Sequence, residues 1–300
     1  METLIWTTMA ALLLAGALFW PRWRRRQALG APLAPERIAI LARRMPIYAR
    51  LGADLQQQLQ RLVQQFLYEK KFVGCDGLLV DDEMRVTIAG QACLLLLNRF
   101  TRVYPALRTI LVYPSAFLVP RNVVDAAGVV TETRQDLLGE SWGDGRVVLA
   151  WDHVQRGAAD WHGGQNVVLH EFAHQLDSES GSTNGAPYLG SQASYRSWSQ
   201  VLSRDFAALR ADAMLRQHSV MDHYGATSPA EFFAVATETF FAKPWEMAER
   251  HPALYEEFGK YYRVDPRQWQ DAPVQPSADD SHAGAAAQLD DDAVQYGHWR

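Results

Sequence analysis

Apolar residues recur every three or four positions over much of the chain, as expected for helices that each bury one face. Leu55, Leu59 and Leu62 show this spacing in a segment that is otherwise rich in glutamine. A continuous apolar run later in the chain predicts a helix that is buried on all sides. The helices predicted in this way cover residues 36–68, 89–98, 194–217 and 245–262.

Two short runs of β-branched and apolar residues predict strands, at residues 109–113 and 147–151. The intervening segment 139–146 contains Trp142 and several glycines, and it predicts a hairpin or an exposed loop. Residues 72–88 carry glycine and aspartate and are compatible with further short strands. Helices therefore dominate, with a small number of strands among them.

The N-terminus has an uncharged stretch, residues 4–20, followed by an arginine-rich flank at 22–26. Its length is at the lower limit for a membrane-spanning helix. Positive charge after the apolar stretch predicts a membrane anchor within residues 1–29, tethered to the inner membrane with the remainder in the cytoplasm. The alternative is a cytoplasmic protein whose apolar N-terminal helix docks on its own core or on a partner.

Changes in composition predict the organisation of the remainder. The 48% hydrophobic content is enough for a sizeable core, whereas the C-terminal end holds many aspartates and few large apolar residues, which is typical of disorder. The predicted segments are a linker at 30–35, the N-terminal part of a globular domain at 36–145, a catalytic core at 146–271 and a disordered tail at 272–300.

Charge and cysteine content argue against two functional classes. The net charge of −5 argues against direct nucleic-acid binding, which requires a basic face. Cys75 and Cys93 form no C-x-x-C pair, so we expect reduced thiols rather than a secreted disulfide scaffold.

The chemistry of the chain is concentrated in one pentapeptide, His170-Glu171-Phe172-Ala173-His174. Its surroundings predict a helix that begins after Asn166 as N-cap and ends by Gly181. On a helix, His170 and His174 lie one turn apart on one face and can reach a single metal ion. Glu171 beside them can take a proton from a metal-bound water. The simpler alternative is two histidines on the polar side of an amphipathic helix.

A catalytic zinc site requires three protein ligands and one open position. The metzincin continuation would need Gly at position 177 and His at position 180, and the chain has Asp177 and Ser180 instead. The third ligand therefore comes from elsewhere. Asp177 can orient a ligand imidazole, or it can be a solvated residue at the end of the helix.

A second apolar helix supplies candidates for the third ligand. Ser228 as N-cap and Pro229 at the first helical position predict where this helix begins. Glu231 is a ligand candidate, although it could instead close a capping box with Ser228. Glu238, two turns further on, is the rival ligand or a partner of a ligand, and His223 is a third candidate.

The motif HEFAHQLD at 170–177, combined with YGATSPAEFFAVATE at 224–238, resembles the Mlc titration factor A family of zinc-dependent peptidases. Residues 111–117 and 147–152 are also similar to that family. The resemblance covers roughly residues 36–270. It implies a catalytic core similar to the peptidase domain of anthrax lethal factor.

The resemblance implies one Zn²⁺ per chain, with His170, His174 and Glu231 as ligands and Tyr224 steadying the oxyanion. The expected fold is α+β and mostly helical, with a gluzincin-type zinc peptidase core and a small sheet next to the HExxH helix. In related metallopeptidases an edge strand pairs with extended substrate. Residues 147–150 are the candidate for that strand, and an ordinary core strand is the alternative.

The expected function is a zinc-dependent peptidase, either an endopeptidase or an aminopeptidase, with a peptide or protein substrate and Glu171 as general base. The first alternative, also implied by the resemblance, is a regulatory binding protein that captures a transcriptional repressor, with hydrolysis secondary. The second alternative is a purely structural zinc site, which would have four protein ligands.

Overall fold

The structure is a computed structural model of the whole chain. It describes residues 23–99, 101–115, 117–124, 130–137, 139–142 and 145–272, with a few positions before residue 23 and with the backbone alone between 116 and 144. No helix in these parts is both long and apolar enough to cross a membrane. Most of the predicted anchor at 4–20, and the predicted tail from residue 273 onward, lie outside the described residues.

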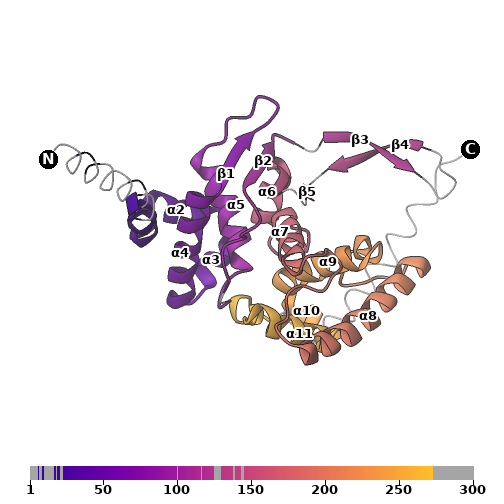
Figure 1. The fold of residues 1–300 in the computed structure, drawn as a ribbon. Coiled ribbons are helices and arrows are strands. Elements are labelled where there is room, and N and C mark those ends of the chain that lie inside the picture. Colours follow the sequence, from indigo (N-terminus) through magenta and orange to yellow (C-terminus); the bar gives the residue numbers. More distant parts are fainter. Residues whose placement is uncertain are drawn as a thin grey trace, which may run out of the picture.

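The first part of the chain forms a group of helices on one side of the molecule (Figure 1). Leu59, Val63 and Phe66 line the buried face of α4, as the apolar spacing predicts. Asp81 caps α5, so this helix begins at Asp82 rather than at the predicted residue 89. The helices are α2 (Pro35–Arg44), α3 (Pro46–Arg50), α4 (Ala53–Glu69) and α5 (Asp82–Leu94).

A four-stranded sheet lies beside these helices, in the order β1-β2-β6-β5. Its strands are β1 (Lys71–Gly74), β2 (Thr109–Tyr113), β5 (Gly139–Trp142) and β6 (Arg146–Ala150). The first two strands and β6 run parallel, with Ile110 opposite Val147, and β5 pairs antiparallel with β6. The predicted strands at 109–113 and 147–151 and the predicted hairpin at 139–146 are confirmed, with β6 displaced by one residue.

The sheet order corrects one prediction. Residues 147–150 belong to β6, which is hydrogen-bonded to β2 on one side and to β5 on the other. This segment is therefore an internal strand and has no free edge for substrate. The outer strand on that side is β5. Gly145, at the end of the β5–β6 connection, has φ +83 and an added Cβ would lie 2.7 Å from the carbonyl oxygen of Ala106, so both backbone and packing require glycine there.

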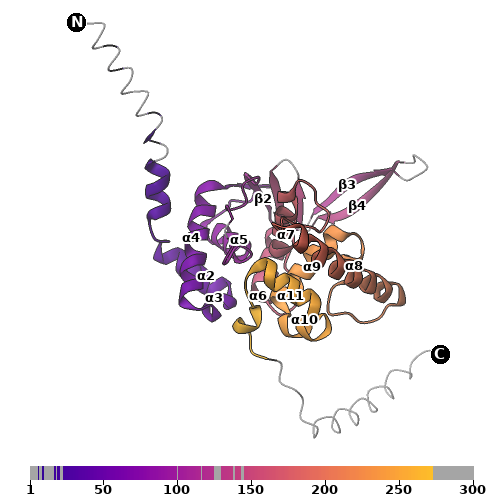
Figure 2. The ribbon, with the colours of Figure 1, turned by 60° about the horizontal axis from the view of Figure 1, so that its bottom comes forward.

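The segment between β2 and β5 forms a separate two-stranded antiparallel ribbon, which extends away from the body of the molecule in both overall views (Figures 1 and 2). Its strands are β3 (Phe117–Val124) and β4 (Val130–Leu137).

The remaining chain is helical and aromatic inside. Phe240 packs against Tyr255, Phe258 and Tyr262 with ring centroids 4.9–5.8 Å apart. Pro252 divides the predicted helix 245–262 into two. The helices are α6 (Trp151–Ala159), α7 (Val167–Asp177), α8 (Gln192–Leu215), α9 (Pro229–Ala242), α10 (Pro244–Arg250) and α11 (Pro252–Tyr262). The fold is α+β and mostly helical, as expected, and α7 lies next to the small sheet and packs against α9 (Figure 1).

Candidate metal centre

The start of α7 is fixed by Asn166, the predicted N-cap. Its side-chain oxygen accepts a hydrogen bond from the backbone N–H of Leu169 at 3.0 Å. Its amide group donates to Gln91 Oε1 at 2.8 Å and to the carbonyl of Gly157 at 3.1 Å. All three bonds are buried, so the first turn of the helix is held from two other helices. This anchoring determines the direction in which the pentapeptide faces.

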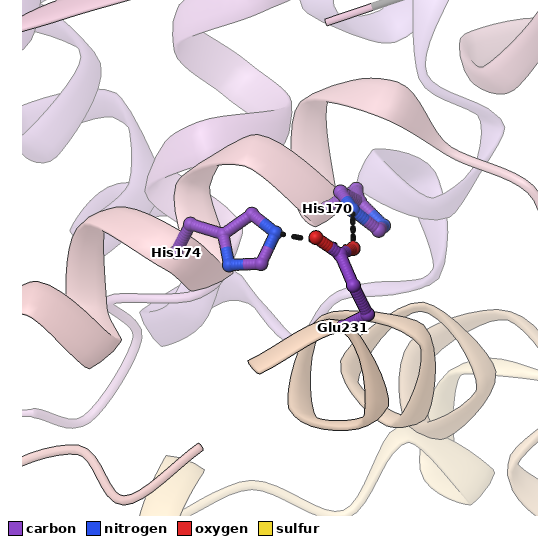
Figure 3. A group of neighbouring side chains, drawn as sticks. All are labelled: His170, His174 and Glu231. Atoms are coloured by element: carbon purple, nitrogen blue, oxygen red, sulfur yellow. Dashed lines mark hydrogen bonds and ion pairs between the residues drawn. The ribbon is translucent and has the colours of Figure 1, made fainter. Parts of the chain in front are cut away.

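The opposite side of the centre comes from the first turn of α9. Ser228 Oγ accepts a hydrogen bond from the backbone N–H of Glu231 at 3.2 Å, and Pro229 occupies the first position, as predicted. The Glu231 carboxylate does not turn back to its own helix terminus. Its Oε2 lies 2.9 Å from His170 Nε2 and 3.4 Å from His174 Nε2 (Figure 3). The backbone N–H of Glu231 thus takes part in the N-cap of α9, and its side chain faces the two imidazoles.

These three side chains fit a divalent metal ion. One ligand atom from each of His170, His174 and Glu231 lies within 4.8 Å of the other two. Among the residues that the structure describes, no other group of three His, Cys, Asp or Glu side chains has this proximity. Two imidazole nitrogens and one carboxylate oxygen are a ligand set of catalytic zinc sites.

Glu238 contacts His170 but does not belong to the group of three candidate ligands. Its Oε1 is 2.7 Å from His170 Nδ1, and its other oxygen accepts a hydrogen bond from the backbone N–H of Asn166. The carboxylate therefore occupies the Nδ1 side of the ring and leaves Nε2 directed at Glu231. Of the two roles predicted for Glu238, this geometry suits the partner of a ligand rather than a ligand.

The two carboxylates of the site have pKa values that are shifted in opposite directions. Glu171 is 5% exposed, its Oε2 has no hydrogen-bond partner among the described residues, and burial raises its pKa to about 7. Burial would also raise the pKa of Glu231, but the hydrogen bonds and charges of His170 and His174 outweigh it and lower the pKa to about 2. One carboxylate is therefore disposed to exchange a proton near neutral pH, and the other stays ionised.

Tyr224 lies at the entrance of the centre. It belongs to the short 3₁₀ helix His223–Ala226, and its ring centroid is 6.0 Å from that of His170. The residue is 47% exposed and lies beside the metal-binding group. His223, the third candidate ligand, is not part of that group.

A profile of the glucose-regulated metallo-peptidase M90 family matches residues 20–263. The chain belongs to this family. This chain is 42% identical over 249 residues to an uncharacterized protein of Synechocystis sp., and the match covers 82% of this chain and 90% of that protein. It is 34% identical to Mlc titration factor A of Pectobacterium atrosepticum (84% of this chain, 95% of the relative) and 32% identical to that of Enterobacter sp. (83% and 92%). The resemblance to the Mlc titration factor A family is confirmed, and membership implies a metal.

One alternative for Asp177 is wrong in this M90 chain. Asp177 is fully buried rather than solvated, because its Oδ2 accepts a hydrogen bond from the backbone N–H of Gly185 at 2.7 Å. It holds the loop that follows α7 close to the end of the helix. His174 Nδ1 has no hydrogen-bond partner in the described part of the chain, so Asp177 makes no hydrogen bond to that ring nitrogen.

The sequence did not indicate how Asn166 and Glu238 are connected. They are 72 residues apart, and Glu238 links the backbone of Asn166, the N-cap of α7, to the ring of His170 through two hydrogen bonds. The only signal was that Glu238 shares a helix face with Glu231, which suggested a role at the site but not which atom it contacts.

Proposed function

We propose that this chain is a zinc-dependent peptidase whose metal ion is held by His170, His174 and Glu231. The observation that carries the proposal is the convergence of two imidazole nitrogens from α7 and a carboxylate from α9 within 4.8 Å. Membership of a metallopeptidase family supports it. With three protein ligands rather than four, a position stays open for water and substrate, which disfavours a purely structural site.

The bound zinc ion would polarise the scissile carbonyl and make a water molecule more acidic. Glu171 is the general base. It follows His170 directly on α7, it is buried, and its oxygen without a partner is available to accept a proton. Its raised pKa, about 7, suits a group that takes a proton from water and returns it to the leaving amine.

Tyr224 would donate a hydrogen bond to the oxyanion that develops on the substrate. Its half-exposed ring lies beside that of His170, with ring centroids 6.0 Å apart. One such donor contributes a few kcal/mol to transition-state stabilisation in well-formed sites.

The outer strand β5 would hold the substrate. It is antiparallel to β6, has no strand on its other side among the described residues, and lies against α7. An extended peptide can add to such an edge through main-chain hydrogen bonds, which places its backbone along the helix that carries the metal ligands. This strand takes the role that the sequence suggested for residues 147–150.

A second function is supported by the names of the relatives. Two of the similar proteins are called Mlc titration factor A, which describes proteins that titrate Mlc. By this analogy the chain would capture a transcriptional repressor, with hydrolysis secondary. Tethering through residues 4–20 stays a prediction.

Metal content and peptide hydrolysis of the purified chain test the first function. We expect one zinc per chain, activity that a chelator removes and zinc restores, and loss of both zinc and activity in Glu231→Ala. Glu249→Ala, an exposed change on α10, is the matched control and should behave as the unchanged protein. Zinc retained at full occupancy by Glu231→Ala would contradict the ligand assignment.

Two further comparisons separate the alternatives. Cleavage of free peptides but not of N-terminally blocked peptides would identify an aminopeptidase, and cleavage of both an endopeptidase. Repressor binding that persists in a metal-free, inactive variant would favour the capture function.

A further inference from the structure

Gly185, in the segment that connects α7 to α8, is buried and contacts three helices. Its backbone N–H donates a hydrogen bond to Asp177 Oδ2 at 2.7 Å, and its carbonyl accepts one from Trp198 Nε1 at 2.9 Å. Asp177 is the last residue of α7, and Trp198 lies on the buried side of α8. Because both bonds are buried, they hold the main chain of Gly185 firmly between these two helices.

The third helix that Gly185 contacts is α9. A Cβ added to Gly185 would lie 2.4 Å from the carbonyl oxygen of Pro229 and 2.9 Å from its carbonyl carbon, which is closer than side chains pack. The backbone also has φ +79, in the left-handed region that favours glycine. Pro229 is the first residue of α9. The main chain of Gly185 therefore lies directly between the end of α7 and the start of α9.

These two helix ends carry proposed zinc ligands. His174 precedes Asp177 by three residues, and Glu231 follows Pro229 by two, so each ligand is within one helical turn of a residue that contacts Gly185. Glu231 Oε2 and His174 Nε2 are 3.4 Å apart. A metal ion accepts its ligand distances only within about 0.2 Å. The spacing between the two helix ends therefore determines whether both side chains can bind one ion.

We propose that Gly185 is a positioning residue of the metal centre, whose main chain sets the distance between the last turn of α7 and the first turn of α9. The inference rests on the proposed zinc-binding function, but the spacing it concerns exists with or without a bound ion. A side chain at position 185 would push Pro229 away by about 1 Å, because the two buried hydrogen bonds keep the segment from withdrawing. That displacement would carry Glu231 away from His174.

The zinc affinity of Gly185→Ala, measured on the full chain by competition with a chromogenic chelator, tests the proposal. We expect zinc to bind about 10- to 100-fold more weakly than to the unchanged protein, as when a group that orients a ligand is lost.

Gly190→Ala is the matched control. Gly190 lies in the same segment with φ +77, but a Cβ added there meets nothing within 4 Å among the described residues. This variant has the same backbone strain as Gly185→Ala without the contact with α9, so its zinc affinity should be unchanged. Equal zinc affinity in the two variants would overturn the proposal.

A second control separates positioning from a general loss of stability. Val63→Ala removes buried methyl groups from α4, which carries none of the proposed ligands, and should lower the melting temperature. Zinc affinity of the folded chain should stay within about twofold of the unchanged protein, because the site is remote. If Val63→Ala weakened zinc binding as much as Gly185→Ala, the role of Gly185 would be structural only.

Trp198→Phe tests the support of Gly185 from α8, and does so even if Gly185→Ala does not fold. It removes the donor to the Gly185 carbonyl and keeps an aromatic ring, so zinc affinity should fall by about 2- to 10-fold. Trp245→Phe on α10 loses a bond of the same kind, from Nε1 to the carbonyl of Gln270, and should retain its affinity. Equal affinity in these two variants would contradict the role of the Trp198 bond.

Crystal structures of the metal-free chain and of metal-free Gly185→Ala decide the question without zinc. The distance between Glu231 Oε2 and His174 Nε2 should be longer in the variant by at least about 0.5 Å. An unchanged distance, with the start of α9 in the same place, would overturn the proposal and leave the ligand assignment intact. If the unchanged protein bound no zinc, the ligand assignment would fail, and this distance would still decide the role of Gly185.

Discussion

At the scale of single residues, the centre is determined by which atom of each side chain faces which neighbour. His170 is in contact with carboxylates through both ring nitrogens, since Glu231 lies at Nε2 and Glu238 at Nδ1. A metal ion would take the place of the His170–Glu231 contact, whereas the contact with Glu238 could persist. Glu231 and Glu238 should therefore respond differently to substitution, although both are glutamates on α9.

Glu238→Gln tests this difference. It removes the charge that orients His170 but leaves the three ligands, so zinc affinity should fall by about 10- to 100-fold without being lost. Competition with a chromogenic chelator measures the change. Glu246→Gln, exposed on α10, should have unchanged affinity. If Glu238→Gln abolished zinc binding as completely as Glu231→Ala, Glu238 would be a ligand rather than a partner of one.

The parts of the site that could be predicted are those that depend on short sequence separations. His170 and His174 are four residues apart on one helix, and Asn166 and Ser228 cap helices within three residues of themselves. The contact between Glu238 and Asn166 spans 72 residues and depends on how α7 packs against α9. Local spacing does not encode that packing, so the residues left both roles of Glu238 open.

At the scale of elements, the positions of helices depend on local sequence and could be predicted, whereas the order of the strands in the sheet could not. Apolar spacing predicted where most helices lie, and the exceptions have local causes, as with Pro252, which divides α10 from α11. Strand positions were also predicted, but which strand is at the edge depends on pairing between distant segments. Segment 139–142 precedes β6 in the chain and pairs antiparallel with it, so β5 rather than β6 forms the edge on that side.

The packing of α8 against the α10–α11 junction should depend on pH through Asp205. Burial raises the pKa of Asp205, but hydrogen bonds from His251 at 2.8 Å and from Arg204 at 2.8 Å outweigh it, so the pKa lies below its ordinary value. A lowered folded-state pKa means that the carboxylate stabilises the fold above the ordinary aspartate pKa. This contribution is lost as the pH falls through the folded-state pKa.

Asp205→Asn measures this contribution. The free energy of unfolding from urea titrations should be lower in the variant by about 1–3 kcal/mol at pH 6–7, because two charge-assisted hydrogen bonds are weakened. The difference should narrow below about pH 4. Asp212→Asn, at a half-buried position near the end of the same helix, should show no such difference. A gap that stays constant down to pH 2 would contradict the assignment.

At the scale of the whole molecule, the proposed ligands join two helices that are distant in sequence. His170 and His174 lie on α7 and Glu231 on α9, and in the sequence these two helices are separated by α8 and its connections. Because zinc would bind only the folded arrangement, it should stabilise the fold by mass action.

Thermal unfolding with and without zinc checks this coupling. Zinc at about 100 times its dissociation constant should add about 2.7 kcal/mol to the free energy of unfolding and raise the melting temperature. Glu231→Ala should show little of this shift because it lacks one of the three ligands. An equal shift in that variant would mean that the stabilising zinc binds elsewhere.

The measurement that tests the central claim most directly is Glu171→Gln, with zinc content and peptide hydrolysis determined on the same sample. The substitution keeps the size of the side chain and leaves the proposed ligands in place. The account predicts one zinc per chain, as in the unchanged protein, with peptide hydrolysis reduced by at least about 100-fold. Hydrolysis at the unchanged rate with zinc bound would contradict the assignment of Glu171 as the general base.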